Sequence, residues 1–336
     1  METRILGKTS LDVSVVGLGG IPIQGLSFDD SALVLHKALD CGITFIDTAR
    51  GYTDSEEKIG RALSSRRSEF ILASKALSRD AAGMAKEIET SLRDLQTDFI
   101  DIYQLHAIGS DKELAQVLAP GGAYEALARA REQGKVGFLG ITSHSRPALI
   151  AAIQTGAFDT VQHPFNPIEI EWSDDVIPAA TEAGVGIIAM KPAAGGALTH
   201  VPAALRFELT RGIDVVIPGM DSIAQVEENA AVGERLRPPN HAELLALACE
   251  KERWGGRFCR RCGYCMPCPN GLHIPMLLLL HAYYERYDLI DWALERLAGL
   301  EKKYSDCTAC GECLEKCPYH LPIPDLMARG AEQVRR

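Results

Sequence analysis

Short apolar runs alternate with helix-periodic segments over the first 235 residues of the chain. The runs are rich in Val, Ile and Phe: VSVVGLGG, TFIDTA, EFILASKA, FIDIYQLHA, VGFLGITS, TVQHPFN, GIIAMKP and DVVIPGM. Each is followed by a segment with apolar residues at helical spacing, and several segments end in Gly. Strands that are apolar along their whole length are buried on both faces, as in parallel sheets. Eight even β–α units predict an α/β fold, a closed (β/α)8 TIM barrel, with a doubly wound open sheet as the alternative.

The chain departs from this repeat at both ends. METRILGKTSLD alternates around Gly7 and predicts a small hairpin that plugs the barrel floor. Near the other end, IPMLLLLHAYYERYDLIDWALERL has helical periodicity and separates two runs of cysteines. The sequence therefore predicts three parts: a barrel over 1–235, a connecting helix over 236–254 and a smaller C-terminal domain over 255–336.

The composition is that of an ordinary soluble globular protein, with 46% hydrophobic and 24% charged residues. A net charge of −10 and a pI of about 5.4 argue against nucleic acid and anionic membranes as partners. We see no secretory signal near the start, and the most apolar run, IPMLLLLHAYY, is too short to cross a bilayer. These features predict a cytoplasmic protein.

Eight of the ten cysteines lie after residue 258. In a reducing compartment, clustered cysteines indicate metal or redox chemistry more often than disulfides. CRRCGYCMPCP and CTACGECLEKCP each place three closely spaced cysteines before a fourth that precedes proline, which is the bacterial ferredoxin pattern. Zinc is the alternative, although zinc sites usually come as separated cysteine pairs. The pattern predicts two 4Fe-4S clusters, in a tail that resembles the α-helical two-cluster ferredoxin-like domains.

In the ferredoxin pattern, the fourth cysteine of each run ligates the cluster of the other run. The expected ligands are Cys259, Cys262, Cys265 and Cys317 for one cluster, and Cys307, Cys310, Cys313 and Cys268 for the second. The first run has two residues before its last cysteine where the pattern has three, so the exchange is a hypothesis. Arg257, Arg260 and Arg261 either keep the first thiolates anionic or form a solvated basic patch. The remaining two, Cys41 and Cys249, are predicted to be core residues.

Polar side chains end several of the predicted barrel strands. Asp47 follows the second strand, Lys75 lies near the end of the third and His106 near the end of the fourth. The reacting groups of such barrels lie at the carboxyl ends of the strands. Neighbouring strands are about 4.8 Å apart, so these three side chains are within reach of one another. Tyr52, five residues after Asp47, can fold back over the same place.

Each of these residues has an ordinary explanation when taken singly: a cap, a surface cation, a buried histidine and a packing tyrosine. Together they form a chemical unit. A lysine ammonium beside a phenol stabilises the phenolate and lowers the phenol pKa, and an aspartate holds the lysine charged. A histidine can donate to a carbonyl oxygen and orient it. The four side chains predict a pocket that donates a proton to a carbonyl or accepts one from an alcohol.

The barrel portion resembles the aldo-keto reductase family through FIDTARGY, ILASK, DIYQLH, GITSHS, VQHPFNP and VIPGM followed by QVEEN. The resemblance implies a catalytic tetrad of Asp47, Tyr52, Lys75 and His106, with Tyr52 as the general acid/base. It also implies an extended NAD(H) or NADP(H) cofactor across the barrel mouth. The GLGG turn at 17–20 lacks the spacing of a Rossmann fingerprint, which agrees with this family.

The same resemblance assigns the cofactor contacts. They are Thr142, Ser143 and Gln162 for the carboxamide, Met190 and Lys191 near the ring, and Gly219, Ser222, Glu228 and Asn229 towards the adenosine. Met190 stands where the family has a ring-stacking tyrosine, so ring orientation is less constrained. Gly219 and Gln225 stand where many members have cations for a 2′-phosphate, and Asp221 lies between them. The missing cations favour NAD over NADP.

Iron–sulfur clusters pass single electrons whereas nicotinamide passes a hydride, and a flavin usually joins the two. The sequence shows no flavin motif, which leaves three alternatives. An electron-transfer partner protein supplies the bridge, the Met190 site holds an unexpected cofactor, or the clusters have a structural or redox-sensing role. One rival hypothesis is a nicotinamide-binding regulatory or electron-carrying subunit that turns over poorly. Another is a Schiff-base barrel that uses Lys75 or Lys191. The sequence favours a reductase of a small carbonyl compound.

Overall fold

The computed structural model describes residues 1–254, 258–261, 263–286, 289–317 and 319–335. The chain divides into two compact units. The first consists of Met1–Ala194 and His200–Leu244, and the second of Gly195–Thr199 and Leu245–Arg336. Each unit is described separately below. No helix in the described ranges is long and apolar enough to cross a membrane.

Eight parallel strands form the sheet of the first unit. They are β3 (Leu18–Gly19), β4 (Phe45–Asp47), β5 (Ile71–Ala76), β6 (Ile100–Leu105), β7 (Val136–Thr142), β8 (Thr160–Pro164), β9 (Gly186–Met190) and β10 (Val215–Ile217). Each pairs with its neighbour in sequence. Parallel bridges Val16–Val216 and Gly19–Gly219 join the first strand to the last. This closure confirms the barrel and excludes the open sheet.

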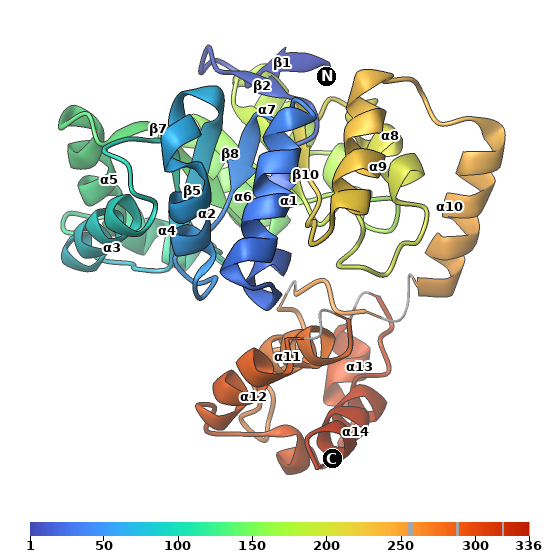
Figure 1. Ribbon diagram of the computed structural model, residues 1–336. Helices are drawn as coiled ribbons and strands as arrows, with labels where there is room; N and C mark the ends of the chain where they lie inside the picture. The colour runs from blue at the N-terminus through green and yellow to red at the C-terminus, as the bar shows by residue number, and fades with distance from the viewer. Residues whose placement is uncertain (255–257, 262, 287–288, 318, 336) are drawn as a thin grey trace. The chain divides into compact units, whose positions relative to one another are not determined.

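Helices surround this barrel in Figure 1. They are α1 (Phe28–Asp40), α2 (Ser55–Leu63), α3 (Ala81–Asp94), α4 (Asp111–Leu118), α5 (Ala123–Glu132), α6 (Arg146–Gln154), α7 (Val176–Glu182), α8 (Val201–Leu209) and α9 (Ile223–Glu234). The eight predicted helices are present. Helix α4 was not predicted; Ser110 starts it by accepting a hydrogen bond from the Glu113 N–H. Asp80 caps helix α3, because its side chain accepts a hydrogen bond from the Gly83 N–H.

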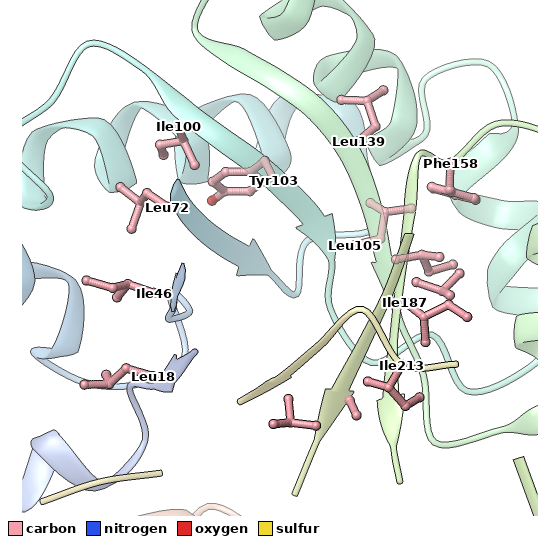
Figure 2. Close-up of a cluster of buried hydrophobic side chains, with 14 of the residues drawn as sticks. Leu18, Ile46, Leu72, Ile100, Tyr103, Leu105, Leu139, Phe158, Ile187 and Ile213 are labelled. Carbon is pink, nitrogen blue, oxygen red and sulfur yellow. The ribbon is translucent and has the colours of Figure 1, made fainter. Parts of the chain in front are cut away.

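A broad apolar layer fills the space between strands and helices (Figure 2). Ile46 and Leu72 point into this layer. Their chain neighbours, Phe45 before Ile46 and Ala73 after Leu72, face the barrel interior. This alternation is the period of two expected of a strand. Each fully buried Leu, Ile or Phe contributes about 1.5–3 kcal/mol to folding. This apolar layer is therefore a major source of the stability of the barrel.

The predicted hairpin is confirmed as β1 (Thr3–Ile5) and β2 (Asp12–Ser14). Leu6 and Val13 belong to the same buried cluster as Phe45 and Ala73 from the barrel interior. Gly186 makes room for Leu6, because a Cβ at that glycine would lie 2.7 Å from Leu6 Cγ. The hairpin therefore plugs the interior, as the sequence predicts.

The second unit is helical: α10 (His241–Trp254, which begins in the first unit), α11 (Ile274–Arg286), α12 (Ile290–Ala298), α13 (Glu312–Lys316) and α14 (Ile323–Gln333). The single helical insert predicted over 274–297 is two helices. Leu277 and Met327 centre a small core, and the Tyr304 hydroxyl donates to the Leu277 carbonyl at 2.6 Å. Cys265 and Cys317 are buried in this core.

Candidate functional site

Strand register brings the polar strand-end residues into the barrel interior. Phe45 and Ala73 face the barrel interior. Asp47 lies two positions after Phe45 on β4, and Lys75 two positions after Ala73 on β5, so both side chains also face the interior. Asp47 is paired in register with Ala73, and Lys75 with Gln104. All eight strands run the same way, so these residues lie at one mouth of the barrel.

Lys75 and Asp47 form a buried ion pair. The Lys75 Nζ donates to Asp47 Oδ1 at 2.6 Å and to the Thr48 carbonyl at 2.8 Å. The two side chains are only 1% and 3% exposed. Burial raises the pKa of Asp47 and lowers the pKa of Lys75, and in both cases the charge of the partner opposes the shift. A buried pair of this kind adds little to stability, so its presence needs a chemical reason.

The Tyr52 ring lies close to the Lys75 ammonium. The Lys75 Nζ is 5.1 Å from the centroid of the Tyr52 ring. The His106 ring meets the Tyr52 ring edge-on, with centroids 6.0 Å apart and planes at 86°. His106 itself is held by its backbone N–H, which donates to the Ala76 carbonyl at the end of β5. The four side chains predicted from the strand ends are thus brought together.

The loop between Asp47 and Tyr52 is tied to two helices through Arg50. Its backbone N–H donates to the Lys75 carbonyl at 2.9 Å. Its guanidinium pairs with Glu56, with Glu87 at 3.1 Å and with Asp94 at 3.0 Å. These contacts fix the path of the chain that carries the phenol.

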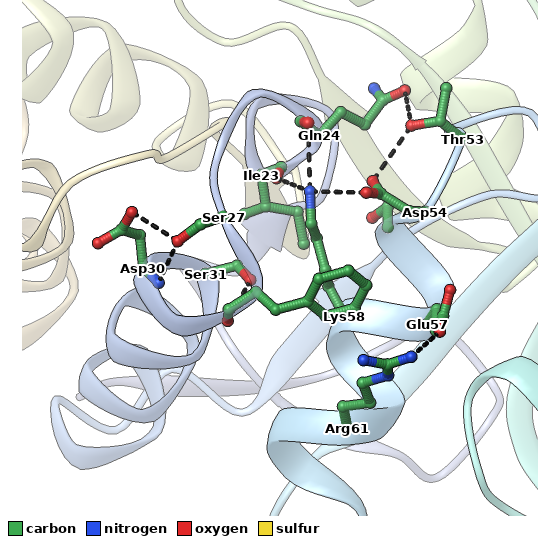
Figure 3. A network of polar contacts seen from close by, with 12 residues as sticks. Ile23, Gln24, Ser27, Asp30, Ser31, Thr53, Asp54, Glu57, Lys58 and Arg61 are labelled. Atoms are coloured by element: carbon green, nitrogen blue, oxygen red, sulfur yellow. Dashed lines mark hydrogen bonds and ion pairs between the residues drawn. The ribbon is translucent and has the colours of Figure 1, made fainter.

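A second tie to the same loop is a buried lysine (Figure 3). The Lys58 Nζ, whose side chain is 2% exposed, donates to the Ile23 and Gln24 carbonyls at 3.0 and 3.2 Å and pairs with Asp54 at 2.9 Å. Ile23 and Gln24 belong to the 3-10 turn Pro22–Gly25 that follows β3. Lys58 therefore joins the loops after β3 and β4 where both reach the mouth.

Three of the predicted cofactor residues follow one another around the mouth. Thr142 ends β7, Gln162 lies in β8 and Met190 ends β9. The Thr142 hydroxyl accepts from the Ala107 N–H at 2.8 Å. The Ser143 hydroxyl donates to the Ile108 carbonyl at 2.6 Å. Both hydroxyls therefore also hold the loop after β6.

The residues predicted for the adenosine end lie after β10. Ser222 is the N-cap of α9, where its hydroxyl accepts from the Gln225 N–H. Glu228 is exposed, whereas Asn229 is buried. Gly219 is exposed and bridges to Gly19. Lys191, after β9, has a positive φ of 59°, and its carbonyl accepts from the Asn166 amide.

Gln104 is a site residue that the sequence analysis missed. It is fully buried in β6, and its Nε2 donates to Gln162 Oε1 at 2.7 Å. Gln104 lies two residues before His106, so the alternation of β6 places both on the inward face of the strand. This spacing could have identified Gln104 as a site residue.

The second unit contains a pocket lined by cysteines from both runs. Cys268 of the first run and Cys307, Cys310 and Cys313 of the second contribute to its wall, together with Cys265. Burial raises the pKa of Cys313, and the nearby Cys307, Cys310 and Cys268 raise it further. Among the described residues, no three His, Cys, Asp or Glu side chains converge on a point suited to a single metal ion. Cysteine thiolates are the usual ligands of iron–sulfur clusters.

The other predicted ligand set is partly described. Cys265 and Cys317 are buried at 7% and 6% exposure, and Cys259 packs against the same core. Cys262 and Arg257 lie outside the described residues. The Arg261 N–H donates to Cys259 Sγ at 3.3 Å, a bond that favours a thiolate.

Two side chains in this part of the chain differ in burial from what was predicted from the sequence. Arg260 is buried, and its guanidinium lies 3.8 Å from the Tyr319 ring centroid, so it does not belong to a solvated basic patch. Cys249 is exposed on α10, so the prediction of a core residue is wrong there; Cys41 is partly buried after α1.

Comparisons with known proteins agree with this architecture. The Aldo/keto reductase family model matches residues 15–203, and a 4Fe-4S dicluster domain model matches residues 258–321. Aldo-keto reductase YhdN from Bacillus subtilis (strain 168) is 32% identical over 204 residues, which cover 54% of this chain and 59% of that protein. A solved aldo-keto reductase from Bacillus halodurans in its holo form shares the fold, with a TM-score of 0.64 at 24% identity over 74% of this chain and 96% of that chain.

L-galactose dehydrogenase from Arabidopsis thaliana is a further relative. It is 30% identical over 284 residues, which cover 69% of this chain and 88% of that protein. The family model matches most of the barrel. Asp47 and Lys75, which the family resemblance implies for the site, form an ion pair there. The chain therefore belongs to the aldo/keto reductase family of oxidoreductases and carries a C-terminal 4Fe-4S dicluster domain.

Proposed function

We propose that the barrel interconverts a small carbonyl compound and its alcohol with NAD(H) or NADP(H). The observation that carries this proposal is the position of the Lys75 ammonium, which pairs with Asp47 and lies 5.1 Å from the Tyr52 ring centroid. A cation held there by a carboxylate stabilises the phenolate that forms when Tyr52 gives up its proton. The dehydrogenase activity in the name of the Arabidopsis relative supports an alcohol as one of the two partners.

In the reductive direction, the Tyr52 hydroxyl donates its proton to the carbonyl oxygen while the carbonyl carbon accepts a hydride. The nicotinamide supplies that hydride when it is bound. His106 orients the carbonyl oxygen by a hydrogen bond, and Lys75 stabilises the tyrosinate left behind. In the oxidative direction, the tyrosinate takes the hydroxyl proton of the alcohol. The proton and the hydride together account for the two hydrogens gained by the carbonyl group.

The mouth of the barrel fits a nicotinamide cofactor. The Gln162 amide is buried and offers N–H donors to a carboxamide oxygen, because its own oxygen already accepts from Gln104. By the family resemblance, Thr142 and Ser143 lie with Gln162 at the carboxamide, and Met190 packs beside the ring. Asp221, exposed at the start of α9, disfavours a 2′-phosphate, so we expect NAD to bind more tightly than NADP.

The C-terminal unit would hold two 4Fe-4S clusters, which supply single-electron transfer when bound. The wall of the cysteine pocket supports the set Cys268, Cys307, Cys310 and Cys313 for one of them. The second set combines Cys259, Cys262, Cys265 and Cys317. A partner protein that exchanges electrons with these clusters is part of the proposal. Iron and sulfide analysis of anaerobically purified protein checks the cluster number.

The replacement Tyr52→Phe tests the proposed reaction. It should lower kcat for carbonyl reduction by about 10²–10⁴-fold, because the general acid is lost, while NADH affinity stays unchanged. Tyr124→Phe is the matched control, since Tyr124 lies on α5 and donates to the Ala157 carbonyl. Steady-state rates and NADH fluorescence titration give both quantities.

Other outcomes would favour the rival hypotheses. A wild-type protein that binds NADH but barely turns over, with Tyr52→Phe indistinguishable from it, would indicate a binding or electron-carrying subunit. Covalent trapping by borohydride of a carbonyl probe on Lys75 or Lys191 would indicate Schiff-base chemistry. Either result contradicts the reductase.

A further inference from the structure

Two amide side chains meet inside the barrel below its mouth. The Gln104 Nε2 on β6 donates to Gln162 Oε1 on β8 at 2.7 Å, and the two residues are 0% and 1% exposed. Strand β7 lies between their strands. The bond therefore reaches past a whole strand, which an ordinary side chain on β7 would prevent.

Gly140 is the residue of β7 that leaves room for this bond. It is paired in register with Gln104 on one side and Thr160 on the other. A Cβ at Gly140 would lie 2.7 Å from Gln104 Cγ and 2.5 Å from Thr160 Oγ1. Both distances are shorter than side chains tolerate, so the glycine permits the amide contact.

The hydrogen bond decides which end of the Gln162 amide points where. Its oxygen is occupied by Gln104, so its NH2 group is left for other partners. The Gln162 amide lies near Asp47 and favours the charged form of that carboxylate, although no donor among the described residues reaches Asp47 Oδ2 in good hydrogen-bond geometry. A reversed amide would instead turn its oxygen towards the carboxylate.

Stability alone does not explain the pair. Replacing both partners of a buried hydrogen bond by apolar groups of the same shape is nearly neutral. The Gln104 Oε1 atom has no hydrogen-bond partner in the described part of the chain, so the arrangement is not fully satisfied. An apolar pair would fill the interior with less difficulty, which points to a role for the amide orientation.

We propose that Gln104 is a positioning residue that holds the Gln162 amide with its N–H groups towards the mouth, where they donate to the carboxamide oxygen of a nicotinamide. The inference rests on the proposed function, because it needs a nicotinamide cofactor at that mouth. Gln104 touches neither substrate nor cofactor. It acts through Gln162, and its pairing in register with Lys75 places it beside the candidate catalytic pair.

Two replacements of Gln104 change its hydrogen bond to Gln162 in different ways. Gln104→Met keeps the length of the side chain and removes the donor. Gln104→Glu places a carboxylate there that accepts from the Gln162 NH2 group and so reverses the amide. Thr160→Val is the matched control, since it changes a neighbouring inward side chain whose Oγ1 has no hydrogen-bond partner among the described residues.

The holo protein is purified anaerobically and assayed with NADH and 4-nitrobenzaldehyde. For Gln104→Met we expect the Kd for NADH to rise about tenfold, the effect of one lost hydrogen bond. NADH deuterated on one face of the ring should also begin to transfer label from the wrong face. Gln104→Glu should show a larger effect on both readouts, and Thr160→Val none.

Three results separate the outcomes. If the wild-type protein binds neither NADH nor NADPH, the proposed function fails and this inference with it. If wild type binds and reduces the probe, and Gln104→Met has the same NADH affinity and the same ring-face selectivity, the inference alone is wrong. If Gln104→Met does not fold by circular dichroism, Gly140→Ala displaces Gln104 while keeping its amide; it must loosen NADH binding and face selectivity in the same direction.

Discussion

The first unit holds two of its four candidate catalytic side chains on strands, whereas the second holds its candidate ligands on loops and short helices. Asp47 and Lys75 lie in β4 and β5, whose backbones are paired on both sides. Cys307 and Cys310 precede α13, a helix of five residues. The barrel can fold without the chemistry of its site, because a large apolar layer stabilises it.

The second unit lacks that independence. Its core includes Cys265 and Cys317, so its interior is built partly from the predicted ligands. Because ligand binding contributes folding free energy in such domains, the clusters would stabilise the fold as well as carry electrons.

Removing the clusters should give the largest difference between the units. After anaerobic chelation of iron, we expect the C-terminal unit to unfold and become sensitive to protease while the barrel stays resistant and still binds NADH. Limited proteolysis followed by mass spectrometry locates the cleavage sites. Cleavage spread equally over both units would contradict the comparison.

A single replacement sharpens the same test. Cys268→Ser should reduce bound iron to about half, because Cys268 is an expected ligand of one of the two clusters and not of the other. Cys249→Ser is the matched control, since Cys249 is exposed on α10 outside both runs. Equal iron loss in both variants would show that Cys268 is not a ligand.

Within the barrel, the ion pair should matter for chemistry more than for folding. Lys75→Met leaves the Asp47 carboxylate buried without its cation, so we expect unfolding free energy to fall by about 3–5 kcal/mol and activity to disappear. Adding Asp47→Asn should restore most of the stability and none of the activity. Urea unfolding and steady-state kinetics measure the two effects.

The double replacement distinguishes a chemical role of the ion pair from a structural one. If it stays as unstable as Lys75→Met, the pair is structural and the barrel depends on its site as the second unit does.

Glu208 gives a smaller and pH-dependent effect on the barrel. Burial raises its pKa well above the usual value, and neither carboxyl oxygen has a hydrogen-bond partner in the described residues. Above the unfolded pKa of about 4.3, the unfolded chain releases a proton that the folded chain keeps. Stability therefore falls as pH rises, by up to about 1.4 kcal/mol per pH unit until the folded pKa is reached.

Glu208→Gln should remove this loss. Its stability advantage over wild type should grow between about pH 5 and pH 8 in urea unfolding experiments and vanish near the unfolded pKa. Glu182→Gln, at an exposed position of α7, is the control. An advantage independent of pH would mean that Glu208 is ionised in the fold.

The strands and the four clustered side chains were predictable because each depends on local pattern plus one rule about parallel strands. Apolar runs locate β4, β5 and β6, and their common direction brings Asp47, Lys75 and His106 to one mouth. Helix α4 was missed because DKELAQVL lies in a stretch that begins and ends with Gly and reads as a loop.

Contacts across several strands were beyond the sequence analysis. The bond between Gln104 and Gln162 requires the register of three strands and the space at Gly140, none of which is visible in a linear pattern. Ser222 shows a different difficulty, since the same hydroxyl suits a helix cap and a cofactor contact. The assignments of cofactor and cluster ligands accordingly stay predictions.

Arg50 has a consequence for how substrate reaches the phenol. Its guanidinium joins Glu56 of α2 to Glu87 and Asp94 of α3, so the segment carrying Tyr52 cannot open locally without breaking contacts of two helices. Segments tied to the core in this way open rarely, on the timescale of large-scale unfolding. Tyr52 would then be a fixed element during turnover, and any gating motion would belong to other loops around the mouth.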